Sequence, residues 1–172
     1  MKDLRRKQVV FIQYYNSPCG EIILASAGDW NKMSCAERNK HRLMRLLNAE
    51  CIIATSAVLE ETKKELDEYF AGKRHTFEIP LHPVGTDFQK QVWQALLEIP
   101  YGETRTYKEI AQKINKLKCI RAVAQAIGAN GISILIPCHR VIGTNRSLTG
   151  YAGGIEAKRL LLNIECQNTP YD

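Results

Sequence analysis

Several features that define large protein classes are missing from this 172-residue sequence. No segment approaches the ~20 consecutive apolar residues that a membrane-spanning helix needs. The segment 1–7 has a net positive charge, but it leads into a strand-like segment without the apolar core of a signal peptide. The six cysteines are spread along the chain, and none forms a C-x-x-C pair, which excludes a zinc ribbon and a disulfide framework. These absences predict a reduced, cytoplasmic protein, or a nuclear one if its source is eukaryotic.

Positive charge, in contrast, is abundant and unevenly placed. The chain has 24 Lys and Arg against 18 Asp and Glu, a formal net charge of +6. Between residues 104 and 148 only one acid, Glu109, stands against eight basic residues: Arg105, Lys108, Lys113, Lys116, Lys118, Arg121, Arg140 and Arg146. Such a local excess favours a polyanionic partner, of which nucleic acid is one.

The first half of the chain predicts a small α+β unit with no reaction site. β-type runs at 8–15 and 21–27 are joined by a turn-rich link and indicate a hairpin. Ser56 is placed to cap a helix that ends near Ala71. The other expected elements are a short helix at 36–47 and strands at 51–54 and 75–80. Residues 81–85 form a plausible boundary between two domains.

The second half predicts helices. Thr86 caps a helix whose buried side is expected to hold Phe88, Val92, Trp93, Leu96 and Leu97. Thr106 and Glu109 fit a capping box that opens a helix running to Ile114, with Ile110, Ala111 and Ile114 facing inward. An alanine-rich helix follows at 119–129. Two short helices, a tight link and basic side chains suit a helix-turn-helix, and they equally suit two solvated helices of a bundle.

The stretch from Ile132 to Gly143 places a cysteine and a histidine directly after an apolar run. The run 132–136 is mostly β-branched and predicts a buried extended segment, which Pro137 forces to turn. Cys138 becomes a useful nucleophile only if a base accepts its proton, and His139 is the nearest candidate. Neighbouring residues on a strand point to opposite faces, so the pair needs a bridging water or a turn. The alternative is a cysteine that serves as a small buried hydrophobe.

The chain ends with a glycine-rich loop and a helix. Residues 149–154 are flexible enough to shape a pocket around the ring of Tyr151. The final helix is expected at 155–165, with Leu160, Leu161 and Ile164 buried. A carboxylate at the C-terminal end of a helix, such as Glu165, opposes the helix dipole. Glu165 therefore needs a partner such as His139, unless the helix end is simply solvated.

Taken together, these segments closely resemble the O6-alkylguanine-DNA alkyltransferases, also called methylated-DNA–protein-cysteine methyltransferases. The resemblance spans about residues 86–165 and rests on residues 134–141, on 121–123 with Asn130, on Tyr107 and on 150–154. It implies an α+β fold. A small N-terminal α/β domain of ribonuclease H-like fold would occupy residues 1–82, and a mainly helical C-terminal domain with a helix-turn-helix would occupy residues 83–172.

The resemblance also implies a reaction. Cys138 would accept an alkyl group from O6 of guanine, or from O4 of thymine, in a single irreversible turnover without a cofactor. Its proton would leave through a water shared with His139, and Glu165 would hold the imidazole. Asn130 would order the segment that carries the cysteine, and Tyr107 would supply a proton towards the base ring. The alkyl pocket would be lined by Val141, Tyr151, Ala152, Gly153 and Lys158.

The implied partner is double-stranded DNA that carries the alkylated base, bound by a monomer. The target atom is unreachable inside a duplex, so the base must be flipped out. By resemblance, Arg121 would fill the gap in the stack. The helix that carries it would enter the minor groove, with Ala122, Ala124 and Ala126 allowing close approach and Tyr107 nearby.

Two departures from the family pattern bear on these expectations. Some members bind zinc in the first domain, but Cys19, Cys35, Cys51, His41 and His75 show no convincing match, so no metal is predicted. Ala152 stands where some members carry a serine, which leaves a backbone N–H as the substitute donor. Two other functions compete. A lesion-binding regulator would not need Cys138, and a cysteine hydrolase would leave the basic helix pair unexplained.

Overall fold

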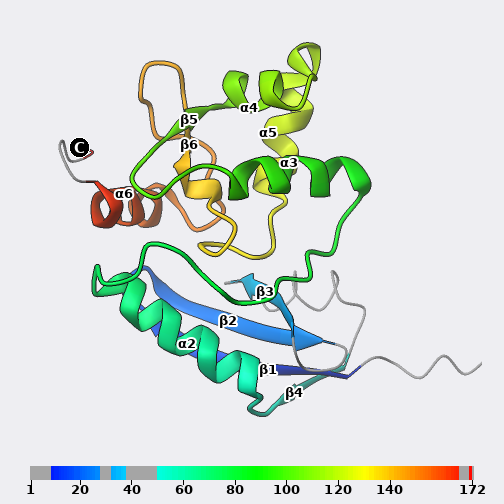
Figure 1. The fold of residues 1–172 in the computed structure, drawn as a ribbon, viewed down its shortest axis with the longest axis vertical. Coiled ribbons are helices and arrows are strands. Elements are labelled where there is room, and N and C mark those ends of the chain that lie inside the picture. The colour runs from blue at the N-terminus through cyan, green and yellow to red at the C-terminus, as the bar shows by residue number, and fades with distance from the viewer. Residues whose placement is uncertain (1–8, 28–31, 38–49, 167–170, 172) are drawn as a thin grey trace, which may run out of the picture.

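The structure is a computed structural model that describes residues 9–27, 32–37, 50–166 and 171. Its N-terminal part is a sheet with the strand order β3-β2-β1-β4 (Figure 1). β1 (Val9–Ser17) pairs antiparallel with β2 (Gly20–Ala27), which confirms the predicted hairpin. β3 (Lys32–Glu37) continues the antiparallel order beside β2, and β4 (Glu50–Ile53) lies parallel to β1.

One long helix, α2 (Ala57–Phe70), packs against this sheet. It begins as predicted, because the Ser56 side chain accepts a hydrogen bond from the Leu59 N–H. Alternation along the first strands buries Tyr15, Ile22 and Leu24 in the same apolar cluster as Leu59 and Leu66 of the helix.

Two predictions for the N-terminal half need correction. Residues 75–80 do not form a strand. Their apolar side chains, Phe77 and Ile79, alternate as in a strand because both pack against the core, but among the described residues the segment pairs with no sheet. The helix expected at 36–47 is wrong at its start, because residues 36 and 37 belong to β3. Its remainder, 38–47, lies outside the described residues.

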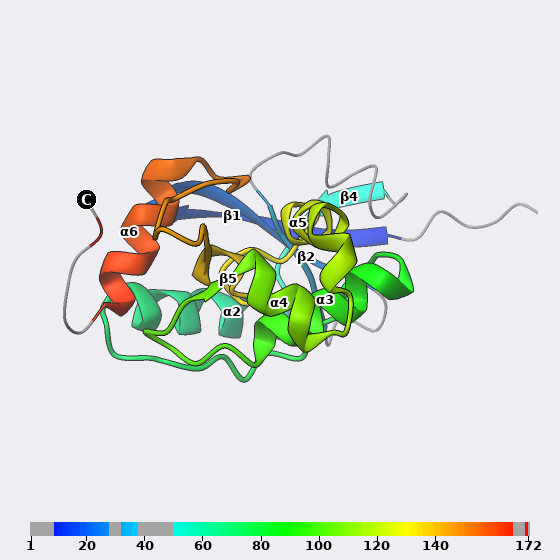
Figure 2. The same ribbon diagram turned by 90° about the horizontal axis from the view of Figure 1, so that it is seen from above.

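The C-terminal part is mainly helical and lies over the sheet (Figure 2). Its elements are α3 (Asp87–Leu97), β5 (Arg105–Thr106), α4 (Tyr107–Lys113), the short 3-10 helix η1 (Leu117–Cys119), α5 (Ile120–Gly128), the 3-10 turn η2 (Cys138–Arg140), β6 (Val141–Ile142) and α6 (Ile155–Glu165). β5 and β6 pair in parallel. A sheet domain followed by a mainly helical domain confirms the predicted fold class.

The two paired helices α4 and α5 form as the sequence predicts. α4 opens with a complete capping box, in which the Thr106 hydroxyl accepts from the Glu109 N–H and the Glu109 carboxylate accepts from the Thr106 N–H. α3 opens in the same way at Thr86 and Gln89. The expectation that Leu97 is buried is wrong: this residue is 42% exposed at the last turn of α3.

Among the described residues, the larger of two buried apolar clusters runs through both domains and joins them. Tyr15, Leu59 and Leu66 of the sheet domain share it with Trp93 and Leu161 of the helical domain. The Trp93 indole N–H donates to the Ala126 carbonyl at 2.8 Å, which fixes α3 against α5. Within the described part of the chain, no helix is both long and apolar enough to span a bilayer.

Candidate active site

The segment before Cys138 is buried, as predicted, but it is a tight turn rather than an extended strand. Ile134 has a φ of 73°, and the Ile136 N–H donates back to the Ile132 carbonyl at 3.0 Å. A β-branched residue at positive φ is strained and persists only where its surroundings impose it. Pro137 then leads into the 3-10 turn η2, in which Cys138 and His139 are both buried. In a 3-10 turn, successive side chains do not alternate between two opposite faces as they do on a strand.

Asn130 holds the turn from inside. Its side-chain oxygen accepts from the Ile132 N–H at 3.0 Å, and its Nδ2 donates to the Ile136 carbonyl at 2.9 Å. The same Nδ2 lies 3.2 Å from the sulfur of Cys138 and donates to it. A donor aimed at the sulfur favours the thiolate over the thiol. Asn130 thus orders the loop and also acts on the candidate nucleophile.

His139 is paired with Glu165, as the sequence predicts. Its Nε2 lies 2.7 Å from Oε1 of Glu165, and the imidazole is fully buried. Because the carboxylate is ionised, Nε2 carries the proton and the other ring nitrogen, Nδ1, is the basic one. Nδ1 is buried and has no hydrogen-bond partner among the described residues. Burial lowers the pKa of His139, so the ring is neutral at neutral pH and can accept a proton at Nδ1.

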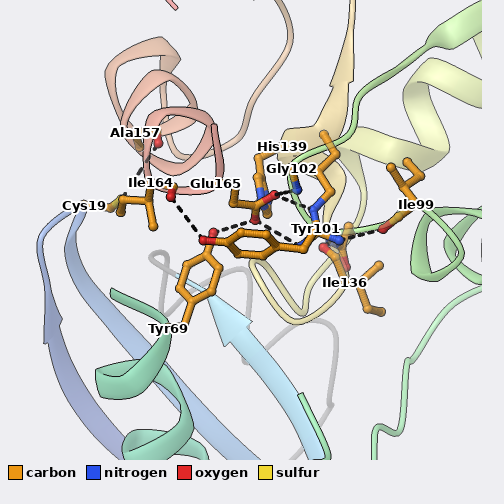
Figure 3. Close-up of polar contacts among 12 residues, drawn as sticks. Cys19, Tyr69, Ile99, Tyr101, Gly102, Ile136, His139, Ala157, Ile164 and Glu165 are labelled. Carbon is orange, nitrogen blue, oxygen red and sulfur yellow. Dashed lines mark hydrogen bonds and ion pairs between the residues drawn. The ribbon is translucent and has the colours of Figure 1, made fainter. Parts of the chain in front are cut away.

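Glu165 gathers donors from several elements (Figure 3). Arg140 donates from Nε to Oε2 at 2.7 Å and from Nη2 to Oε1 at 3.0 Å, while its Nη1 reaches the Ile99 carbonyl at 2.6 Å. The Gly102 N–H lies 3.3 Å from Oε2. Burial alone would raise the pKa of Glu165, but the hydrogen bonds and charges of His139 and Arg140 outweigh it and hold that pKa far below its usual range.

A second polar junction lies on the other side of the turn. Lys158 is fully buried in α6, and its Nζ donates to the Val141 and Thr149 carbonyls. The Tyr107 hydroxyl donates to the same Thr149 carbonyl at 3.0 Å. Burial lowers the pKa of Lys158 to about 8, and the charge of Cys138 acts in the opposite direction. By reciprocity, the Lys158 ammonium favours a Cys138 thiolate.

Tyr107 and the glycine-rich loop close over this junction. Burial raises the pKa of Tyr107; the hydrogen bond to Thr149 lowers it and the charge of Cys138 raises it, but the net shift is upward, so the phenol stays protonated. Gly150 has a φ of 61°, and a Cβ there would lie 3.0 Å from the Tyr107 hydroxyl. Tyr151 packs against the core, whereas Ala152 is exposed. The structure therefore gathers Asn130, Tyr107 and Lys158 around Cys138, with His139 next to it in the same turn.

The candidate DNA face needs two corrections. Arg121 and Ala122 are exposed on α5 and Ala124 is partly exposed, but Ala126 is only 3% exposed and faces the core beside Trp93. Ala126 belongs with Val123 and Ile127 to the buried face of α5, because residues three and four positions apart lie on the same side of a helix. Arg140, counted among the basic residues of the segment, is buried against Glu165 and is unavailable to a phosphate.

Two side chains of the Glu165 network were missed from the sequence. Arg140 could have been found, because a buried carboxylate at a helix C-terminus requires a cation. Tyr69, whose hydroxyl donates to Glu165 Oε1 at 2.7 Å from 96 positions away, left no local signal. For the described residues, no group of three His, Cys, Asp or Glu side chains could hold a metal ion, and His41 lies outside them.

Comparison with known proteins identifies what the chain is similar to. Residues 10–83 match the family model described as 6-O-methylguanine DNA methyltransferase, ribonuclease-like domain. Residues 87–167 match the model described as 6-O-methylguanine DNA methyltransferase, DNA binding domain. The two matches together account for most of the chain.

Individual relatives agree with these matches. A methylated-DNA–protein-cysteine methyltransferase of Methanosarcina barkeri is 47% identical over 158 residues, which are 90% of this chain and 98% of that protein. One from Haemophilus influenzae is 43% identical over 164 residues, covering 91% of this chain and 86% of the relative. The crystal structure of Mycobacterium tuberculosis OGT in complex with DNA superposes with a TM-score of 0.78 at 39% identity, covering 94% of this chain and 95% of that one.

Proposed function

The chain belongs to the 6-O-methylguanine DNA methyltransferase family and acts in DNA repair by moving an alkyl group from O6 of guanine in DNA to one of its own cysteines; we propose that this cysteine is Cys138. One observation carries the assignment. Cys138 lies in a buried turn where Asn130 donates to its sulfur, next to a fully buried histidine–carboxylate pair.

In the proposed reaction a C–S bond forms as the C–O bond to guanine breaks. The Cys138 proton passes through a water to Nδ1 of His139, and Glu165 accepts the hydrogen bond from Nε2–H as the ring becomes charged. The sulfur then attacks the saturated carbon in line with the bond to O6. Tyr107 supplies a proton towards the base as the guanine leaves. The thioether product does not hydrolyse readily, so each molecule acts once.

We propose that α5 carries the DNA interface, with the damaged base flipped out of the stack. Arg121 is exposed on α5, where it can enter the duplex and hold the gap open. The small side chains of Ala122 and Ala124 let the helix approach the minor groove closely. Lys116 and Lys118, exposed in the link before α5, supply phosphate contacts.

The pocket is proposed to form where the glycine-rich loop meets the end of η2. Val141 and Lys158 define its base, since Lys158 ties the Val141 carbonyl to the loop. Tyr151, Ala152 and Gly153 line its mouth. Ala152 offers no hydroxyl, which leaves its backbone N–H to contact the alkylated oxygen.

Four further points of the proposal rest on the chemistry and on the family. O4-alkylthymine is a second substrate, and the protein acts as a monomer. It works in a reducing compartment, because the acceptor must remain a thiol. The domain division falls at 82/83.

The test is intact mass after incubation with O6-benzylguanine and, separately, with a duplex that contains O6-methylguanine. We expect one adduct per molecule, mapped to the Cys138 peptide and absent from the peptide of the exposed Cys119. Cys138→Ala should lose the adduct and keep DNA binding, whereas Cys51→Ala should react like the unchanged protein. If the protein binds the lesion but forms no adduct, the alternative of a lesion-binding regulator replaces the proposed reaction. If it instead hydrolyses an ester or amide repeatedly, the alternative of a cysteine hydrolase replaces it.

A further inference from the structure

The N-terminal domain contributes a side chain to the hydrogen-bond network around Glu165. Tyr69, in the last turn of α2, points across the boundary between the domains and donates its hydroxyl to Glu165 Oε1 at 2.7 Å (Figure 3). Oε1 is the same atom that contacts Nε2 of His139. The phenol and the imidazole therefore share one carboxylate oxygen, although they come from different domains.

The tyrosine ring is held rigidly. It is fully buried, meets the Tyr101 ring edge-on at 6.3 Å between centroids, and packs against Phe70 and Phe77 at 5.3 and 5.4 Å. A fixed ring directs its hydroxyl to one place. Burial and the Glu165 charge raise the pKa of Tyr69 well above its ordinary value, so the phenol remains a donor throughout the working range.

Burial lowers the pKa of His139, and the hydrogen bond and charge of Glu165 oppose that effect. A carboxylate that accepts a hydrogen bond from Nε2–H stabilises the protonated form of the ring. Each additional donor on the same carboxylate oxygen weakens that stabilisation. Several charged or titratable groups face the His139–Glu165 pair from the elements packed around it. They are Arg140 of η2, Lys158 of α6, Tyr69 of α2 and Tyr101, on which His75 stacks at 4.1 Å.

We propose that Tyr69 is a positioning residue through which the N-terminal domain sets the proton affinity of His139, a role that rests on the proposed function. Its hydroxyl takes part of the Glu165 charge and fixes the orientation of the carboxylate. The imidazole consequently stays neutral before the reaction and receives the Cys138 proton during it. The domain that carries no reacting group thereby tunes the base of the other.

The decisive variant is Tyr69→Phe, which keeps the ring and removes the donor. The assay is alkylation of Cys138 by O6-benzylguanine, measured by intact mass across a range of pH, and the rate should fall at low pH as His139 becomes protonated. Without the Tyr69 hydroxyl the protonated ring is better stabilised, so the midpoint of this acid limb should move upward by roughly half to one pH unit. A purely structural role would slow the reaction at every pH and leave the midpoint in place.

Tyr15→Phe is the matched control. The Tyr15 hydroxyl also donates to a carboxylate of α2, Asp67, at 2.8 Å, but neither residue is among the groups that act on His139. The control should keep the midpoint of the unchanged protein. If Tyr69→Phe fails to fold, 3-fluorotyrosine at position 69 keeps the shape and donates more strongly, and it should move the midpoint downward.

The outcomes separate the two proposals. Absence of an adduct on the unchanged protein would overturn the proposed function. An unchanged protein that is alkylated at Cys138, together with a Tyr69→Phe or fluorotyrosine variant of identical midpoint, would overturn only the role of Tyr69. Opposite shifts in the two variants would establish it.

Discussion

Replacing Arg140 with methionine is expected to destabilise the protein by about 3–5 kcal/mol, because it leaves a buried carboxylate without its cation. The guanidinium makes two bonds to Glu165, at 2.7 and 3.0 Å, and a third to the Ile99 carbonyl at 2.6 Å. The Glu165 side chain is 1% exposed, so water cannot replace the lost donors. Methionine preserves the packing of the aliphatic stem, which confines the change to charge and hydrogen bonding.

Arg159 provides a control with the same chemistry in a different setting. It contacts Glu156 at 2.6 Å within α6, but the Glu156 side chain is 85% exposed. Exposed pairs contribute about 0–1 kcal/mol, so Arg159→Met should be nearly neutral. Burial, and not the N–O distance, is therefore predicted to set the difference between the two variants.

The assay is equilibrium unfolding in urea, with thermal unfolding beside it. In a chain of this size each 1 kcal/mol corresponds to about 2–4 °C in Tm, so Arg140→Met should melt roughly 6–20 °C lower. Adding Glu165→Gln removes the orphaned charge and should restore part of the loss. If Arg140→Met costs less than about 1 kcal/mol, or if Glu165→Gln restores nothing, the reasoning from buried charge is refuted.

Three further predictions concern the turn, the DNA face and the buried lysine. Asn130→Ala should lower the free energy of unfolding, measured by urea titration, by about 2–3 kcal/mol, because the Ile132 N–H and the Ile136 carbonyl lose their partner. It should also slow alkylation of Cys138. A variant with unchanged stability and an unchanged rate would contradict both roles. Arg121→Ala should slow repair of duplex DNA far more than reaction with the free base, and equal losses on both substrates would refute its role in flipping. Folding lowers the pKa of Lys158 from 10.5 to about 8, so above pH 8 the folded protein binds fewer protons than the unfolded chain and stability rises. Relative to Lys158→Met, the unchanged protein should gain about 1–2 kcal/mol between pH 8 and pH 9.5 in urea unfolding, and parallel curves would contradict this.

Local chemistry made parts of this structure predictable. The Thr106 cap, the Ser56 cap and the final helix at 155–165 were found because their signals lie within a few residues of each other. The pairing of His139 with Glu165 was predicted for a different reason. A carboxylate at the C-terminal end of a helix is unfavourable, so a partner had to exist.

The predictions that were wrong, and the contacts that were missed, concern features that depend on distant parts of the chain. The turn at Ile134 defies the β-branched preference because Asn130 and the surrounding core impose it, and no window of sequence shows that constraint. The face of α5 that Ala126 occupies is set by packing on Trp93, which comes from another helix. Tyr69 reaches Glu165 only because the two domains share one core.

The Thr149 carbonyl has a consequence for how this protein can evolve. One backbone oxygen receives hydrogen bonds from Tyr107 and Lys158, and so ties α4, the glycine-rich loop and α6 together. The Thr149 side chain is exposed, and the bonds do not use it. Many residue types can therefore occupy this position without disturbing the junction, provided that the backbone keeps its path. A position that is central to the geometry of the site can therefore vary in sequence. The constraint falls instead on Tyr107 and Lys158, whose side chains donate to its carbonyl.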